Sequence, residues 1–165
     1  MKKQGFTLIE LMVVIVIMGI LAAVAVPKLF GMIAKSKASE VGPAAGTYVK
    51  LQDAFAAERN AAGGWKLIGY TNPASNNFTY SGTGVGDAAT VALTALNNNV
   101  GWQAQNIPAL NECTANNGCT WKVTLANGTV GGQIKYHACQ STKAAPFTPN
   151  FDAISTPGAT GCTVN

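Results

Sequence analysis

The chain has 165 residues, of which 11% are charged, and its formal net charge is +4. This length fits one domain of ordinary size. The lysines form no basic stripe, which excludes a nucleic-acid-binding composition, and apolar and aromatic residues recur throughout, which excludes intrinsic disorder. Apolar residues are most concentrated before Ala34, whereas the remainder is polar through neutral side chains such as Asn, Thr and Ser.

The first long apolar run, residues 6–26, contains a single charged residue, Glu10. The run fits the roughly 20 apolar residues needed to cross a bilayer, with Lys2 and Lys3 on the cytoplasmic side. A cleaved secretory signal is the alternative, because residues 23–25 (Ala-Val-Ala) have the small-x-small form of a cleavage site. Glu10 argues against that alternative, since it interrupts the run early. An ionised group in hydrocarbon is costly unless it is paired or neutralised, so Glu10 is a candidate functional residue.

The N-terminal stretch KKQG-FTLIE resembles the leader signal of type IV pilins and of the related pseudopilins. The similarity covers the basic leader, the consecutive motif positions from Phe6 to Glu10 and the apolar helix that follows, and it ends near Lys35. The resemblance implies that a dedicated peptidase cuts after Gly5 and removes residues 1–5 as a leader. The same enzyme is then expected to methylate the new N-terminus at Phe6.

The resemblance also implies that Glu10 sets the register of assembly. Cutting after Gly5 leaves a positive amine on Phe6, which in the family pairs with the matching carboxylate of an adjacent subunit. Leaving either charge alone in an apolar bundle is unfavourable, so only the axial offset that joins them is tolerated. The alternative is that Glu10 pairs with the Phe6 amine of its own chain and caps the helix N-terminus. Both pairings can occur at different stages.

A long helix is predicted to run from the membrane segment into the head. Residues 6–27 form its transmembrane or filament-core part, which Gly19 and Pro27 weaken; the resemblance implies that this stretch unwinds in assembled filaments. Residues 28–62 form an amphipathic second part. Its apolar stripe repeats at spacings of three and four residues and consists of Val41, Ala45, Tyr48, Leu51 and Phe55.

Residues 63–165 form the predicted head, where period-two patterns and turn residues replace the helical pattern. Residues 65–70 and 78–80 fit short strands or parts of a connecting loop. Asp87 is expected to cap a short helix over residues 88–96.

The clearest local prediction in the head is a β-hairpin. Thr120–Leu125 alternates in polarity, Asn127-Gly128 favours a type I′ turn, and residues 130–138 return. The apolar face, with Trp121, Val123 and Leu125, would pack against the helical stripe. The predicted fold class is therefore α+β: a long N-terminal helix whose second half packs on a small antiparallel β-sheet, as in pilins.

The four cysteines lie in the last third of the chain, at Cys113, Cys119, Cys139 and Cys162. An even number of cysteines behind an N-terminal membrane signal predicts disulfides and an oxidising compartment. Four cysteines allow three pairings, and the sequence alone does not decide between them. The resembled family favours a C-terminal disulfide loop, which supports Cys139–Cys162 and leaves Cys113 with Cys119.

Motifs for catalysis are weak. The glycine-rich stretch Gly82–Gly86 lacks the spacing and the strand–helix context of a dinucleotide fingerprint, and His137 has no nucleophile or carboxylate at motif spacing. We find no carboxylate pair, metal cluster or phosphate loop. The sequence therefore predicts no enzyme, no metal and no cofactor.

The resemblance implies a structural subunit that polymerises into a type IV pilus filament after leader cleavage and N-terminal methylation, serving adhesion, motility or surface attachment. The implied partners are other pilin subunits, the leader peptidase/methyltransferase, a pilus assembly platform with its motor, and the membrane before assembly; nucleic acid is not expected. The chain would wait in the bacterial inner membrane and then work in an extracellular surface filament. The alternatives are a pseudopilin of a type II secretion system, or a minor pilin whose Trp65, Trp102 and Trp121 stack on sugars or bases.

Overall fold

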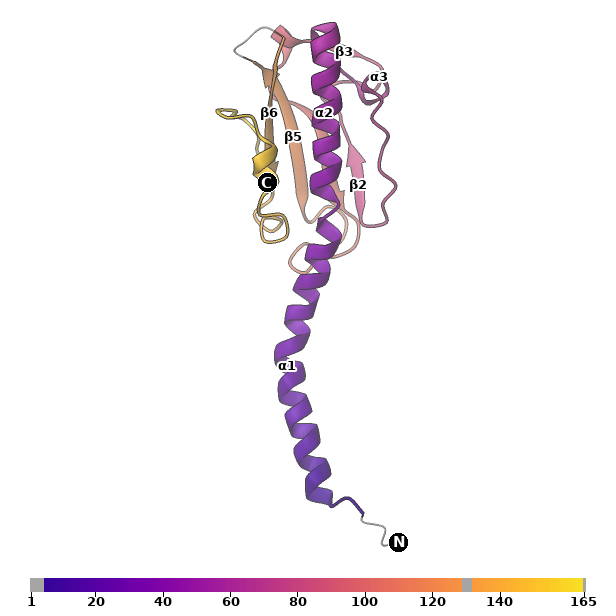
Figure 1. Cartoon of the computed structure of the whole chain (residues 1–165), viewed down its shortest axis with the longest axis vertical. Coiled ribbons are helices and arrows are strands. Elements are labelled where there is room, and N and C mark those ends of the chain that lie inside the picture. Colours follow the sequence, from indigo (N-terminus) through magenta and orange to yellow (C-terminus); the bar gives the residue numbers. More distant parts are fainter. Residues whose placement is uncertain (1–4, 129–131, 165) are drawn as a thin grey trace.

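The computed structural model describes residues 5–128 and 132–164 and has a long helical rod whose upper half lies against a β-sheet head (Figure 1). The rod consists of α1 (Leu8–Ala38) and α2 (Val41–Arg59). A turn at Ser39–Glu40 separates them. Pro43 explains this interruption, because a proline carries no N–H to continue the helical ladder. The predicted long helix is confirmed, with one break between α1 and α2.

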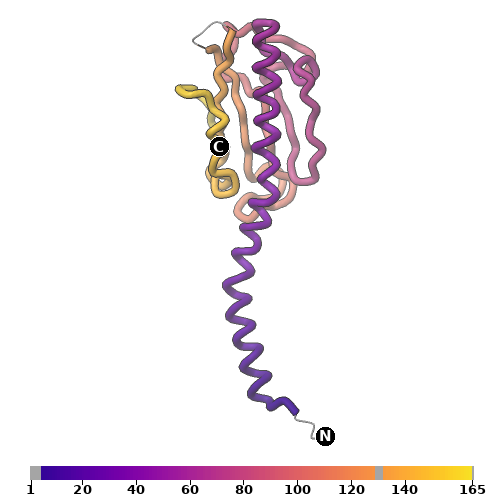
Figure 2. Tube along the Cα trace, viewed as in Figure 1, coloured from indigo at the N-terminus to yellow at the C-terminus, as the bar shows by residue number. Residues whose placement is uncertain are grey.

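The first part of the rod projects beyond the head (Figure 2). All of its large apolar side chains are exposed as far as Ile33, and its buried residues are Ala34 and Ala38. The segment Leu8–Arg59 contains an 18-residue window with a mean hydropathy of 2.9, none of it buried. By length and composition, this helix can cross a membrane.

α2 packs on the head through a stripe in which small residues alternate with Tyr48 and Gln52. Its buried positions are Val41, Ala45, Tyr48, Gln52 and Ala56. The first three were predicted, and the other two predicted members of the stripe, Leu51 and Phe55, pack against the core but are only partly buried. A polar residue takes the central place because its amide is fully bonded: Gln52 Nε2 donates to Gly63 O (2.6 Å), and Gly63 N–H donates to Gln52 Oε1 (3.1 Å).

The main sheet has four antiparallel strands in the order β2-β4-β5-β6. These are β2 (Phe78–Ser81), β4 (Asn99–Asn106), β5 (Thr120–Asn127) and β6 (Ile134–Gln140). Val123 pairs with Trp102 on one side and with Ala138 on the other, on the face that packs on α2. A two-stranded sheet joins β1 (Ala61–Gly63) to β3 (Thr90–Ala92). The predicted α+β class is confirmed.

One glycine lets the helix approach the sheet closely. Gly101 lies at a bulge in β4, and a Cβ built there would be 2.1 Å from the hydroxyl oxygen of Tyr48. The large Tyr48 side chain therefore fits over the sheet only because position 101 has no side chain.

Several local predictions are corrected. Residues 65–70 contain the short helix α3 (Trp65–Ile68) rather than a strand, whereas the strand at 78–80 is confirmed as β2. The predicted helix over 88–96 is wrong: this stretch forms β3 and the 3₁₀ helix η1 (Leu93–Ala95). Pairing of β3 with β1 extends the backbone there, which overrides the local helical pattern.

The β5–β6 hairpin is confirmed, but its connection is longer than a two-residue type I′ turn. Asn127 pairs with Ile134, and Gly128 N–H donates to Gln133 O (3.2 Å), so the returning strand begins at Ile134. Residues 129–131, which fall within the predicted turn and return, lie outside the described residues.

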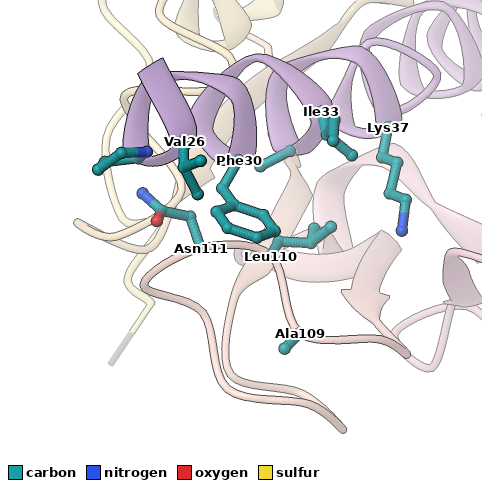
Figure 3. A pocket seen from close by; sticks show the side chains of 9 residues that line it. Val26, Phe30, Ile33, Lys37, Ala109, Leu110 and Asn111 are labelled. Atoms are coloured by element: carbon teal, nitrogen blue, oxygen red, sulfur yellow. The ribbon is translucent and has the colours of Figure 1, made fainter. Parts of the chain in front are cut away.

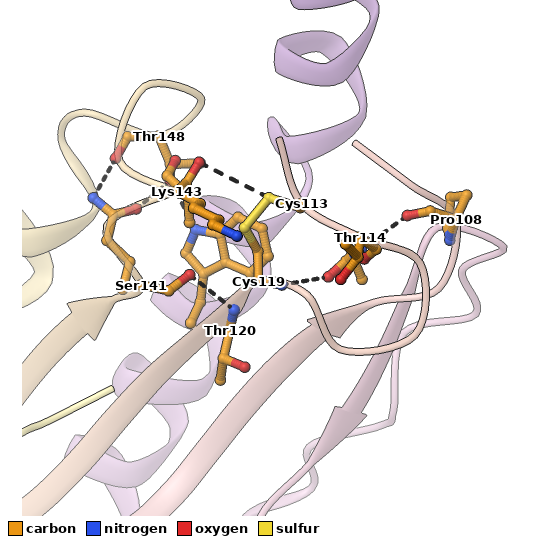
Figure 4. Close-up of a disulfide and its surroundings, with 12 residues drawn as sticks. Pro108, Cys113, Thr114, Cys119, Thr120, Ser141, Lys143 and Thr148 are labelled. Atoms are coloured by element: carbon orange, nitrogen blue, oxygen red, sulfur yellow. Dashed lines mark hydrogen bonds between the residues drawn. A yellow bond between two sulfur atoms is a disulfide. The ribbon is translucent and has the colours of Figure 1, made fainter. Parts of the chain in front are cut away.

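The C-terminal segment covers the free edge of β6 after the 3₁₀ helix η2 (Phe151–Ile154). Thr156 N–H donates to Tyr136 O (2.8 Å), and Cys162 N–H donates to His137 Nδ1 (2.9 Å). The structure contains two disulfides, Cys139–Cys162 and Cys113–Cys119, with Cα–Cα distances of 5.9 and 5.3 Å. The second joins two buried cysteines and closes a short loop whose residues 114–117 are exposed (Figure 4).

Candidate functional site

The N-terminal end of α1 is built as a capping box. Thr7 is the N-cap residue; its backbone N–H and its hydroxyl both donate to Glu10 Oε2, each at 2.7 Å. In return, Glu10 N–H donates to Thr7 Oγ1 (3.3 Å). The pattern Thr-x-x-Glu at a helix start produces this reciprocal arrangement. The second carboxylate oxygen, Oε1, makes no hydrogen bond to the described part of the chain, so it is free to accept from outside.

The sequence analysis missed Thr7 as the partner of Glu10, although the Thr-x-x-Glu spacing could have revealed it. Before cleavage Phe6 is joined to Gly5 and has no free amine, so the carboxylate turns to Thr7. Phe6 itself is 85% exposed. A Cβ built at Gly5 meets no described atom within 4 Å, so the fold of the subunit does not by itself require glycine there.

The structure places Gly19 and Pro27 in the middle of the exposed rod. α1 continues through both positions, with a gentle curve (Figure 1). A Cβ at Gly19 would meet nothing within 4 Å, so no packing in the subunit requires this glycine. Pro27 removes the N–H that would bond the carbonyl of Ala23. The helix is therefore intact in the free subunit but lacks one of its hydrogen bonds.

A hollow of about 680 Å³ lies at the neck, where the rod meets the head. Val26, Phe30 and Ile33 line it from α1, and Ala109 and Leu110 line it from the loop before Cys113 (Figure 3). Phe30 points toward Leu110 yet remains 58% exposed. The neck hollow thus continues the exposed apolar surface of the rod onto the head.

The chemistry available at these surfaces is apolar burial and charge pairing. Within residues 5–128 and 132–164, no group of three His, Cys, Asp or Glu side chains is placed to hold a metal ion. His137 uses its Nδ1 to hold the backbone of Cys162.

The tryptophans do not form the stacking surface that the adhesive alternative required. Trp102 and Trp121 are 0% exposed, and their ring nitrogens donate to Tyr70 and Thr148 inside the head. Trp65 is half-buried against Tyr70.

Comparisons with known proteins give a consistent result. A family profile described as the prokaryotic N-terminal methylation motif matches residues 1–26. A type IV major fimbrial protein, FimA of Dichelobacter nodosus (strain VCS1703A), is 34% identical over 133 residues, covering 80% of this chain and 72% of that protein. The type IV major pilin protein PilA of Myxococcus xanthus (strain DK1622) is 36% identical over 80 residues, covering 48% of this chain and 36% of that protein.

A secretion protein is also similar. The type II secretion system core protein G of Escherichia coli (strain K12) is 35% identical over 108 residues, which is 66% of each chain. No solved structure is a significant match. A methylation-type N-terminus on an apolar helix, joined to an α+β head, defines the class of pilin-like subunits. Since the similarity to the fimbrial protein covers 80% of this chain and so extends into the head, this chain belongs to the type IV pilin family.

Proposed function

We propose that this chain is a structural subunit that polymerises into a type IV pilus filament. The observation that carries the proposal is an asymmetry: the head buries its large aromatic side chains, whereas every large apolar residue of α1 as far as Ile33 is exposed. Such a surface is stable only against lipid or other subunits, because each buried square ångström of apolar area contributes about 25 cal/mol. The similarity to major pilin and fimbrial proteins favours a filament.

Processing precedes assembly in this proposal. The leader peptidase cuts between Gly5 and Phe6 and methylates Phe6, and α1 then holds the subunit in the bacterial inner membrane. The assembly platform and its motor move the subunit into the filament, where α1 exchanges lipid for neighbouring helices. The extended filament lies outside the cell. No catalytic role is assigned to the head.

Glu10 supplies the register of this exchange. Its Oε2 is held by Thr7, which fixes the direction of the carboxylate, and its Oε1 is left to accept the Phe6 amine of an adjacent subunit. The apolar neck hollow lies farther along the same rod and would be covered by neighbouring α1 helices. Gly19 and Pro27 allow the segment between them to unwind when the bundle is formed.

A pseudopilin role in type II secretion is the second candidate, favoured by the similarity to core protein G. The two functions differ in where the protein accumulates. A pilin is the bulk component of long surface filaments, whereas a pseudopilin is expected to remain in the cell envelope.

Mass spectrometry of sheared surface filaments tests the proposal. The expected major component begins with methylated Phe6 and contains residues 6–165. A matched Gly5→Leu variant should remain as membrane-bound precursor, because the fold tolerates a side chain at this position and only the peptidase requires glycine. A mature chain that begins at Val26 would instead establish the secretory signal. Absence of this chain from surface filaments would favour the pseudopilin.

A further inference from the structure

A second hollow, of about 450 Å³, is lined by residues of α3, of β2 and of the loops that follow them. Figure 1 shows α3 and β2 on the side of the head away from the C-terminal segment. Three aromatic side chains, Trp65, Tyr70 and Tyr80, line it. Pockets of this size that combine an apolar floor with a few polar groups are typical of small-molecule sites. The pilin framework assigns no role to this hollow.

The aromatic floor is held rigidly from behind. Trp65 Nε1 donates to Gly101 O (2.9 Å), and Tyr70 OH donates to Ala44 O (3.2 Å). Tyr80 OH donates to Glu40 Oε1 (3.1 Å). The polar atoms of all three rings are therefore occupied by the protein. Tyr70 and Tyr80 are only 7% and 8% exposed, so the half-buried Trp65 presents most of the aromatic C–H and π surface to the hollow.

The rim of the hollow is polar and unengaged. Its side chains are those of Lys66, Asn72, Ser81, Thr83 and Asp87. None of them makes a side-chain hydrogen bond or an ion pair with the described part of the protein. Backbone bonding sets their positions instead: Lys66 N–H donates to Asp87 O (3.0 Å), which places these two oppositely charged residues at the same part of the rim.

We propose that this hollow binds one pyranose ring of a neutral carbohydrate. The apolar C–H face of a sugar ring packs on aromatic surface, while its hydroxyls need the mixed donors and acceptors that the rim provides. One cation beside one anion gives the rim no net charge, which disfavours strongly charged ligands. Gly82 lies directly beside Trp65: a Cβ there would be 2.5 Å from Trp65 Nε1, so a larger residue would displace the ring.

Intrinsic fluorescence of the full chain reports this binding directly, because Trp102 and Trp121 are 0% exposed and only Trp65 lines the hollow. The protein is solubilised in a detergent without a sugar headgroup and titrated with methyl glycosides of glucose, galactose, mannose and N-acetylglucosamine. At least one should give a saturable change, with a dissociation constant on the order of 1 mM, typical of a small polar ligand.

The variant Asn72→Ala/Asp87→Ala should weaken this binding at least tenfold. It spares the fold, since only the backbone of Asp87 bonds to Lys66, and circular dichroism verifies this. The matched control, Asn111→Ala/Asp152→Ala, changes the same residue types elsewhere on the surface and should bind normally. The proposal is overturned by no saturable response, by equal binding in the two variants, or by an equal response to acetate or lysine. Filament formation is not involved in this readout.

Discussion

The two halves of the helical rod show that hydrophobicity and burial are separate properties. α1 has the more apolar sequence, yet its large side chains are exposed from Leu8 to Ile33. α2 contacts the sheet through small residues, Tyr48 and one amide, Gln52, and the last two are fully buried. Small residues allow the helix to approach the sheet closely, whereas large exposed residues are useful only to a partner. The head therefore folds on its own contacts, and the rod is completed by its surroundings.

This comparison predicts that substitutions in the two halves affect different measurements. Changes in α1 should alter filament yield and leave the unfolding of the head unchanged. Changes in α2 should lower the stability of the head, measured by urea unfolding of the detergent-solubilised chain through the fluorescence of the buried Trp102 and Trp121.

The largest effect is expected for Glu10→Ala. The variant should be made, inserted and cleaved, because leader recognition rests on Gly5 and the basic residues. Filaments should nevertheless be lost or sharply reduced, since the amine of an incoming Phe6 would meet apolar side chains without a counter-charge. Glu10→Gln keeps a hydrogen-bond acceptor and should be milder, and Glu10→Asp should retain partial assembly. Electron microscopy and the yield of sheared filaments measure the effect.

Thr7→Val is the matched test of how the carboxylate is held. It removes the hydroxyl that donates to Oε2 but keeps the charge of Glu10, so filament yield should fall less than in Glu10→Ala. Normal yield of Glu10→Ala filaments, with cleavage and methylation intact, would show that the register role is wrong.

The next effect, Gln52→Ala, belongs to the other half of the rod. The substitution leaves a cavity under α2, and the N–H and the carbonyl of Gly63 lose their hydrogen-bond partners. We expect a loss of about 4 kcal/mol in the unfolding free energy of the head. Gln103→Ala, on the half-buried outer face of β4, is the control and should change it by less than about 0.5 kcal/mol. Equal effects of the two substitutions would contradict the role of Gln52.

Removing the C-terminal disulfide should have a somewhat smaller effect. Cys139 and Cys162 are separated by 23 positions, and loop closure of this size contributes about 3 kcal/mol. Cys139→Ala/Cys162→Ala should lower stability by that amount and expose the tail after Ile154 to proteases, since hydrogen bonds to β6, such as those of Thr156 and Cys162, would hold it without the covalent link.

Tryptic mapping without reductant tests the pairing itself. Lysines separate the cysteines so that peptide 136–143 should be joined to peptide 144–165, while peptide 67–122 contains both Cys113 and Cys119. A link between peptide 67–122 and either of the others would contradict the pairing.

Much of this architecture can be predicted from the sequence, because it depends on local sequence patterns. The capping pattern around Glu10, the stripe of Val41, Ala45 and Tyr48, and the alternation of β5 each follow from a fixed period. The errors occur where distant contacts decide. Gln52 is buried more fully than Leu51 because Gly63 satisfies its amide, and residues 90–92 become a strand because β1 pairs with them. The neck hollow brings Phe30 beside Leu110, which no local pattern links.

The smallest effect is expected at Tyr136, the tyrosine that ties the sheet to α2. Its hydroxyl donates to Asp53 Oδ1 (2.7 Å), and burial first, then this carboxylate, raises the pKa of Tyr136 far above its usual 10.0. Tyr136→Phe should cost about 1 kcal/mol at pH 7, because one hydrogen bond is lost while the exposed Asp53 is solvated.

The pH dependence tests whether the hydroxyl of Tyr136 stabilises the fold in its protonated form. Because the folded pKa of Tyr136 is raised, its contribution is fully present below pH 10 and declines as the pH rises through and beyond 10, where the unfolded chain loses the proton and the folded chain keeps it. Each such tyrosine removes about 1.4 kcal/mol of stability per pH unit in that range. The variant lacks one of these groups, so its deficit should shrink between pH 9.5 and 11 in urea unfolding. A deficit that stays constant or grows would contradict the role given to the hydroxyl, because it would mean that the folded state does not hold Tyr136 in its protonated form beside Asp53.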